Sequence, residues 1–189
     1  MYPVIISENF ISKENCNFIV DLVKDKKFSH TPQNADLPED PILDNKRIRA
    51  LHLYSDFEGI CILDNLESSL NNFVEKNFSA KILDVTSHVL IKYMPNQYID
   101  LHRDWEPADP YVINNNKKQV HLSSITYFNE DFVGGEICIK AEDGYSTDLL
   151  VVAPKTGVTI FIDGNKYHVT KPVISGVKYS YTKFYHLDI

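Results

Sequence analysis

The pattern of apolar and polar residues changes character at about residue 85. Before that point, "ISKENCNFIVDLVKDK" (residues 11–26) begins with Ser12, which is suited to cap a helix. Its apolar residues follow at helical spacing: Cys16, Ile19, Val20 and Val23. "FEGICILDNLESSLNNFVEKNF" (57–78) carries a longer apolar stripe of the same spacing: Ile60, Leu63, Leu66, Leu70, Phe73 and Val74. The pattern therefore predicts two amphipathic helices.

After residue 85 the chain consists of short runs of β-branched and aromatic residues, each bounded by Gly, Pro, Asn or Asp. The runs are "SHVLIKYM", "VHLSSITYF", "GEICIKA", "LLVVAP", "GVTIFI" and "KYSYTKFYHL". Such runs are typical of strands, and no helical pattern separates them. An antiparallel sandwich or barrel with the two helices packed outside it is expected. We therefore predict an α+β fold, a double-stranded β-helix (jelly roll) with N-terminal supporting helices.

The length of 189 residues suits one domain with a well-buried core. We predict a single domain over residues 1–189, with helical support over about 1–84 and the jelly-roll core over about 85–189. Between the predicted helices, residues 30–46 hold three prolines and many turn-forming residues, which favours a surface loop or a flap over a site. The compact size favours a monomer or a dimer.

The charge and cysteine content narrow the classes of partner. A net charge of -7 argues against general nucleic-acid binding and against an anionic membrane surface, so a small molecule or a protein is the favoured partner. The short basic stretches "NNNKKQVH" and "NKRIR" could still contact phosphate or an acidic protein. Three widely spaced cysteines suggest neither a disulfide framework nor a thiolate zinc site. With no secretory or membrane-spanning pattern, a cytoplasmic location is expected.

Candidate chemistry is concentrated in "LHRDW", where His102 and Asp104 are two residues apart. On an extended strand such residues project from the same face and could bind one metal ion together. H-R-D also opens a protein-kinase catalytic loop, but that loop requires Asn five residues after its Asp, and this chain has Asp109 there. A metal site requires a third ligand, for which His168 is the best candidate because it follows the strand "GVTIFI" and a turn. His88, His121 and His186 compete for this role without a comparable context.

Two histidines and one carboxylate form the facial triad of non-haem Fe(II) oxygenases, although zinc could bind the same groups. Ten residues after His168, Lys178 begins the strand "KYSYTKFYH". If its ammonium group is buried in the same cavity, it needs an anionic partner, such as the far carboxylate of a metal-chelating dicarboxylate.

Three elements together resemble a known family: "IKYMPNQYIDLHRDW", "LSSITYFNEDFVGGEICI" and "APKTGVTIFIDGNKYHVTKPVISGVKYSYTKFYH". They look like the 2-oxoglutarate- and Fe(II)-dependent dioxygenases, specifically the prolyl 4-hydroxylase-like branch, over residues 85–189. The resemblance implies that His102, Asp104 and His168 bind iron and that Lys178 pairs with 2-oxoglutarate. It also implies that Tyr93 and Tyr127 are hydrogen-bond donors to that cosubstrate, and it makes ascorbate a candidate cofactor.

The resemblance further implies hydroxylation of a prolyl residue in a peptide or protein, bound in a groove under the 30–46 segment. The same chemistry on a free amino acid, an alkaloid or a nucleobase stays open, as does a non-catalytic metal-binding jelly roll. Gly134, Gly135 and Glu136 are interpreted as a turn that enters the strand "EICIKA". Arg103 and Trp105 should point away from the ligands because neighbouring residues on a strand alternate in direction.

Overall fold

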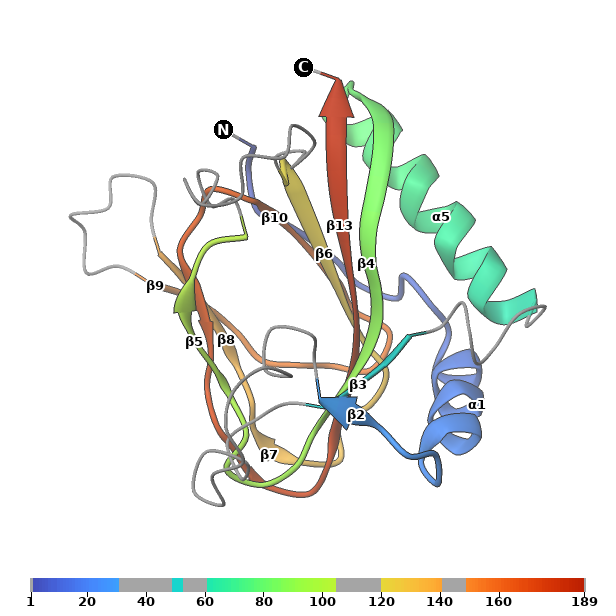
Figure 1. Ribbon diagram of the computed structural model, residues 1–189, viewed down its shortest axis with the longest axis vertical. Coiled ribbons are helices and arrows are strands. Elements are labelled where there is room, and N and C mark those ends of the chain that lie inside the picture. Colours follow the sequence, from blue (N-terminus) through green and yellow to red (C-terminus); the bar gives the residue numbers. More distant parts are fainter. Residues whose placement is uncertain (1, 31–48, 53–60, 105–119, 141–148, 189) are drawn as a thin grey trace.

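The computed structural model describes residues 2–30, 49–52, 61–104, 120–140 and 149–188. Two β-sheets lie opposite each other, and both helices cover the outer face of the larger one (Figure 1). This arrangement confirms the predicted jelly roll with supporting helices. The larger sheet is called the major sheet below, and the four-stranded sheet is called the minor sheet.

The helices form where the apolar spacing predicts them. Helix α1 spans Lys13–Val23, and the Ser12 side chain caps it by accepting a hydrogen bond from the Asn15 backbone N–H at 3.2 Å. Helix α5 spans Cys61–Phe78 and buries one face of leucine and valine residues against the major sheet. Neither of these described helices is long and apolar enough to cross a membrane.

The major sheet has the order β1-β10-β6-β13-β4-β3-β2, and all of its neighbouring strands are antiparallel. In this order its strands are β1 (Ile5–Ser7), β10 (Thr159–Asp163), β6 (Leu122–Tyr127), β13 (Lys178–Asp188), β4 (Lys81–Tyr93), β3 (Arg49–His52) and β2 (Ser29–His30). The long pair β13 and β4 runs through its centre.

The minor sheet has the order β5-β11-β8-β9 and is also antiparallel. Its strands are β5 (Ile99–His102), β11 (His168–Thr170), β8 (Ile137–Lys140) and β9 (Leu149–Val152). A further two-stranded ladder pairs β12 (Val173–Ser175) with β7 (Val133–Gly134). The chain passes from β4 to β5 through a turn in which Asn96 takes a φ of 71°, so the two sheets are joined directly before the first candidate ligand.

The N-terminal part of the chain contributes more than helical support. Strands β1, β2 and β3 extend the major sheet at both edges, and β4 starts at Lys81 rather than at the predicted Ser87. Strands of two to four residues are too short to show an alternating sequence pattern. Their formation depends on pairing with neighbouring strands rather than on the local sequence.

Apolar side chains fill two layers. The layer between the helices and the major sheet includes Leu70, Val74 and Tyr185, none of which is exposed to solvent. The layer between the sheets holds two smaller clusters, one around Ile91 and one around Ile160. The central strand β13 is therefore covered on both faces, and for this reason all of its tyrosines and lysines are buried. One of them, Lys183, forms an ion pair with Glu67 of α5 across the helix layer.

Candidate functional site

The three predicted ligands lie together on the minor sheet. His102 ends β5, Asp104 follows two residues later, and His168 begins β11 directly opposite His102 in the antiparallel register. Their ligand atoms all lie within 4.8 Å of one another. Among the described residues, these three form the group of His, Cys, Asp or Glu side chains that is compact enough to hold a metal ion. His102 Nε2 is 3.4 Å from Asp104 Oδ1, and His168 Nε2 is 3.7 Å from Asp104 Oδ2.

These distances suit one metal ion. Histidine nitrogens and carboxylate oxygens bind divalent metals such as zinc at about 2.0–2.2 Å, so two such atoms on one ion are separated by about 3.0–3.5 Å. The observed separations lie at the upper end of that range or slightly above it. A small closure of the side chains onto an ion would satisfy all three groups.

Backbone carbonyl groups set the orientation of both imidazole rings. His102 Nδ1 lies 2.7 Å from the Asp100 carbonyl oxygen, and His168 Nδ1 lies 2.9 Å from the Lys166 carbonyl oxygen. A carbonyl oxygen only accepts, so each Nδ1 carries the hydrogen and donates it, which leaves Nε2 with a free lone pair in the neutral ring. Burial lowers the pKa of His168, an effect that the charge of Asp104 partly opposes. The neutral, metal-binding form of the ring is therefore favoured.

The Asp104 carboxylate is ionised in this environment. Burial alone would raise its pKa, but interactions with His102, His168 and Ser123 together hold the pKa below its usual value. Ser123, on β6 of the facing sheet, donates a hydrogen bond from Oγ to Asp104 Oδ2 at 2.5 Å. Ser123 could not be singled out from the sequence, where its one distinguishing feature is a neighbouring serine within the strand Leu122–Tyr127.

A buried cation lies on the opposite sheet. Lys178 is only 2% exposed, and its Nζ donates to the Gly135 carbonyl oxygen at 2.9 Å. Nζ also lies 4.3 Å from the ring centroid of Tyr93 and 5.2 Å from that of Tyr127, so the structure brings all three predicted cosubstrate residues together. Burial lowers the Lys178 pKa to about 7, although the charge of Glu136 raises it slightly. No carboxylate of the described residues forms an ion pair with Nζ, so the protonated amine is available to pair with a bound anion.

The Gly134–Gly135 turn has a second role besides leading into β8. Both glycines adopt positive φ values, 83° and 71°, as the turn interpretation requires. A Cβ at Gly135 would lie 3.1 Å from Lys178 Cδ. Gly135 thus leaves room for the lysine side chain and accepts its hydrogen bond, a contribution that the sequence analysis did not predict.

Two of the three competing histidines, His121 and His186, do not join the candidate metal group. His121 instead accepts a hydrogen bond from the Leu187 backbone N–H at 2.9 Å, and His186 is likewise outside the group. Arg103 turns away from the ligands as predicted, donating to Asn165 Oδ1 at 3.1 Å and lying over the Tyr167 ring. The side chain of His88, the whole of Trp105 and residues 31–46 of the predicted flap lie outside the described residues.

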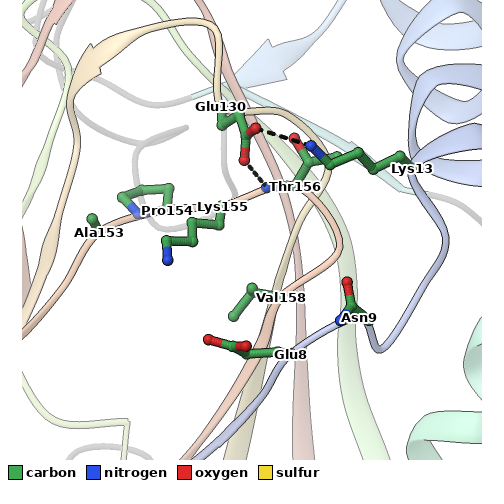
Figure 2. Close-up of a pocket in the computed structure, with 9 residues that line it drawn as sticks. All are labelled: Glu8, Asn9, Lys13, Glu130, Ala153, Pro154, Lys155, Thr156 and Val158. Carbon is green, nitrogen blue, oxygen red and sulfur yellow. Dashed lines mark hydrogen bonds and ion pairs between the residues drawn. The ribbon is translucent and has the colours of Figure 1, made fainter.

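A surface cleft of about 600 Å³ shares no residue with this group. It is lined by Glu8, Asn9, Lys13, Glu130, Ala153, Pro154, Lys155, Thr156 and Val158. Figure 2 shows that Glu130 connects two segments that line the cleft. One of its carboxylate oxygens pairs with Lys13 at 3.3 Å, and the other accepts a hydrogen bond from the Thr156 backbone N–H at 2.9 Å. The cleft is therefore built around the Lys13–Glu130 pair and contains none of the candidate site residues.

Comparison with known families identifies the region that carries these residues. The model of the 2OG-Fe(II) oxygenase superfamily matches residues 88–186, which is more than half of the chain. The match includes the His102, Asp104 and His168 group and Lys178. No curated protein sequence matches the chain.

Solved structures agree on the fold. A prolyl hydroxylase from Trichoplax adhaerens, in complex with a hypoxia inducible factor oxygen degradation domain peptide fragment, is similar with a TM-score of 0.73 at 15% identity, covering 97% of this chain and 83% of its own. A Pseudomonas putida prolyl-4-hydroxylase has a TM-score of 0.68 at 13% identity, covering 98% and 93%. A viral collagen prolyl hydroxylase from Paramecium Bursaria Chlorella virus-1, in a 2OG complex, has a TM-score of 0.64 at 17% identity, covering 98% and 96%.

Proposed function

The chain belongs to the 2OG-Fe(II) oxygenase superfamily and is therefore a dioxygenase that uses Fe(II) and 2-oxoglutarate, and on this basis we propose that it hydroxylates prolyl residues in a peptide or protein. His102, Asp104 and His168 are the proposed iron ligands. Lys178, Tyr93 and Tyr127 are the proposed contacts of 2-oxoglutarate. The observation that carries the proposal is the pairing of a complete ligand triad with a buried lysine that has no carboxylate partner in the described part of the chain.

The chain's own residues prepare the metal site. The Asp100 and Lys166 carbonyl groups hold His102 and His168 with Nε2 directed at the Asp104 carboxylate. The Nε2 lone pairs of the two histidines and the carboxylate oxygens of Asp104 repel one another because no hydrogen lies between them. A divalent cation bound among them removes that repulsion. When bound, Fe(II) and 2-oxoglutarate supply the O2 activation that hydroxylation requires.

The Lys178 site supports 2-oxoglutarate as the anion. A buried ammonium group is costly without an opposite charge, and one end of a dicarboxylate supplies that charge while the other end reaches the metal. Tyr93 and Tyr127 are 3% and 1% exposed, so their rings exclude water from the same space. The Tyr93 hydroxyl lies close to Thr170 and Ser180, and burial raises its pKa, so the hydroxyl stays protonated beside the lysine.

Prolyl substrates are proposed from the fold and from the family resemblance of the sequence. The neighbouring structures are named as prolyl hydroxylases, and one of them holds a peptide fragment. A peptide needs an open approach to the metal, and His102 provides one because its side chain is 32% exposed while that of His168 is 4% exposed. A substrate would therefore approach from the His102 side of the triad.

The first experiment tests the metal and cosubstrate site. Fe(II) and 2-oxoglutarate are titrated anaerobically into the protein while the weak visible metal-to-ligand charge-transfer band is recorded. The band should appear in the wild type, disappear in His168→Ala and persist in His121→Ala, because the His121 ring lies outside the ligand group and accepts a hydrogen bond from the Leu187 backbone N–H. A wild-type protein without the band under saturating conditions would overturn the iron and 2-oxoglutarate assignments.

The second experiment tests the substrate. Proline-containing peptides and free proline are compared for their stimulation of 2-oxoglutarate consumption, and mass spectrometry locates any added oxygen atom. A peptide that gains one oxygen on proline in step with 2-oxoglutarate turnover is the expected result. Coupled turnover with a free amino acid or a nucleobase, and none with peptides, would replace the prolyl assignment with a small-molecule one. Ascorbate dependence, measured in the same assay, stays a prediction, as does the cytoplasmic location.

A further inference from the structure

Ser123 connects the two sheets at the candidate metal site. It lies on β6 of the major sheet and is fully buried, and its hydroxyl reaches across to Asp104 Oδ2 on the minor sheet at 2.5 Å. Its neighbour Ser124 is equally buried but lies on the opposite face of the strand, where its hydroxyl is 3.2 Å from the Tyr185 hydroxyl. Successive strand residues point in opposite directions, so only the first of the two serines can serve the metal site.

The hydrogen bond makes the two oxygens of Asp104 unequal. Oδ2 accepts the Ser123 hydrogen, while Oδ1 faces His102 Nε2 at 3.4 Å. Oδ2 is also 3.7 Å from His168 Nε2, which is beyond hydrogen-bond distance. A carboxylate can bind a cation through one oxygen or through both. An oxygen that already accepts a short hydrogen bond from a fixed donor is less available to a metal than a free one.

We propose that Ser123 is a positioning residue that holds Asp104 as a one-oxygen ligand, with Oδ1 directed at the metal. The inference rests on the proposed iron site and deepens it. Two histidine nitrogens and one carboxylate oxygen leave further metal positions for the cosubstrate and O2, whereas a carboxylate bound through both oxygens would occupy one of them. Ser123 therefore contributes in two ways, by fixing the direction of Oδ1 and by keeping Oδ2 away from the metal.

The expected effect is large enough to measure without turnover. Groups that orient metal ligands through hydrogen bonds change metal affinity by about 10- to 100-fold when they are removed. The Asp104 side chain is only 7% exposed, so water cannot freely replace a missing serine hydroxyl. The Mn(II) dissociation constant of Ser123→Ala should accordingly rise about tenfold or more above the wild-type value.

The test measures Mn(II) binding by electron paramagnetic resonance of the free ion, without 2-oxoglutarate or O2. Ser123→Thr keeps a hydroxyl and should bind Mn(II) nearly as tightly as the wild type. Ser123→Val has a side chain of similar volume to threonine but no hydroxyl, and it should bind Mn(II) as weakly as Ser123→Ala. Ser124→Ala removes the neighbouring buried hydroxyl and should leave the dissociation constant within about twofold of the wild type. Thermal melting of the metal-free variants measures how much each change costs the fold.

The possible outcomes separate this inference from the proposed function. If the wild type binds Mn(II) and Ser123→Ala or Ser123→Val binds it equally well, the positioning role is overturned while the metal site stands. The role is also overturned if Ser124→Ala weakens binding as much as Ser123→Ala does, because the loss would then follow from a disturbed strand. If the wild type binds no Mn(II), the proposed metal site fails and the inference fails with it. Weakening confined to the two variants without a hydroxyl supports the positioning role.

Discussion

The charge on Lys178 predicts how the affinity for 2-oxoglutarate depends on pH. Burial lowers the pKa of this lysine to about 7 in the protein without ligands. The amine is then half protonated at pH 7 and only about 3% protonated at pH 8.5. A bound carboxylate beside Nζ favours the charged form, so 2-oxoglutarate binds the protonated protein and its binding above pH 7 takes up a proton.

The magnitude follows from the fraction of molecules that can bind. The apparent dissociation constant is the intrinsic value divided by the protonated fraction, so it should rise about 16-fold between pH 7 and pH 8.5. That change corresponds to about 1.6 kcal/mol of binding free energy. The two proposed histidine ligands add little to this slope, because the titration uses metal-loaded protein, in which a metal ion bound to a ring nitrogen keeps that nitrogen from taking up a proton.

The assay is anaerobic titration calorimetry of 2-oxoglutarate into the Mn(II)-loaded protein at several pH values between 7 and 8.5. Lys178→Arg keeps a charge that does not titrate in this range, so its dissociation constant should not change with pH. Lys178→Met should bind weakly and show no pH dependence either. A wild-type dissociation constant that stays constant from pH 7 to pH 8.5, or that changes in parallel with the Lys178→Met value, would refute the reasoning.

Three further predictions follow from single contacts. Gly135→Ala places a Cβ at a position with a φ of 71° and 3.1 Å from Lys178 Cδ. It should lower the free energy of unfolding, measured by urea denaturation, by about 1–3 kcal/mol. An unchanged free energy of unfolding would show that the turn relaxes. Tyr93→Phe removes the hydroxyl beside Thr170 and Ser180 and should raise the 2-oxoglutarate dissociation constant about two- to tenfold, while Tyr181→Phe, on the helix side of β13, should not. Lys183→Ala removes the ammonium group that pairs with the Glu67 carboxylate and should lower the free energy of unfolding by about 3 kcal/mol. The double variant with Glu67→Leu should lose less, and an equal loss would argue against a stabilising ion pair.

Much of the fold could be predicted because its determinants are local. Helix α1 has its capping serine and its apolar spacing within 12 residues of sequence, and the structure reproduces both. The longer strands carry enough β-branched and aromatic residues to stand out. Strands β1, β2 and β3 could not be found in this way, because each has four residues or fewer and forms only where the edge of the major sheet offers hydrogen bonds.

The candidate site, like the fold, was predictable where its determinants are local in sequence and not where they depend on tertiary contacts. His102 and Asp104 were predictable as a pair because strand geometry places alternate residues on one face. Bringing His168 opposite His102 required the register of β5 and β11, which the spacing of residues 66 positions apart does not determine. Ser123 and Gly135 were missed for a related reason, since a serine in a strand and a glycine in a turn have common structural roles. Their chemical roles become visible only in the structure, where Ser123 bonds to the Asp104 carboxylate and Gly135 lies against the Lys178 side chain.

The two halves of the site belong to different sheets, and this arrangement explains why a cosubstrate with two distinct ends suits it. The proposed metal ligands His102 and His168 are on strands of the minor sheet, while the proposed cosubstrate contacts Tyr93, Tyr127 and Lys178 are on three strands of the major sheet. Neither sheet alone can hold both the metal and a distal carboxylate. A molecule that reaches from the triad to Lys178 therefore spans the interior of the jelly roll, and the Ser123 hydrogen bond to Asp104 spans the same gap within the protein itself. On the proposed assignment, 2-oxoglutarate has one end on the minor-sheet side, at His102, Asp104 and His168, and the other end at Lys178 of the major sheet, so the residues that bind it come from both sheets.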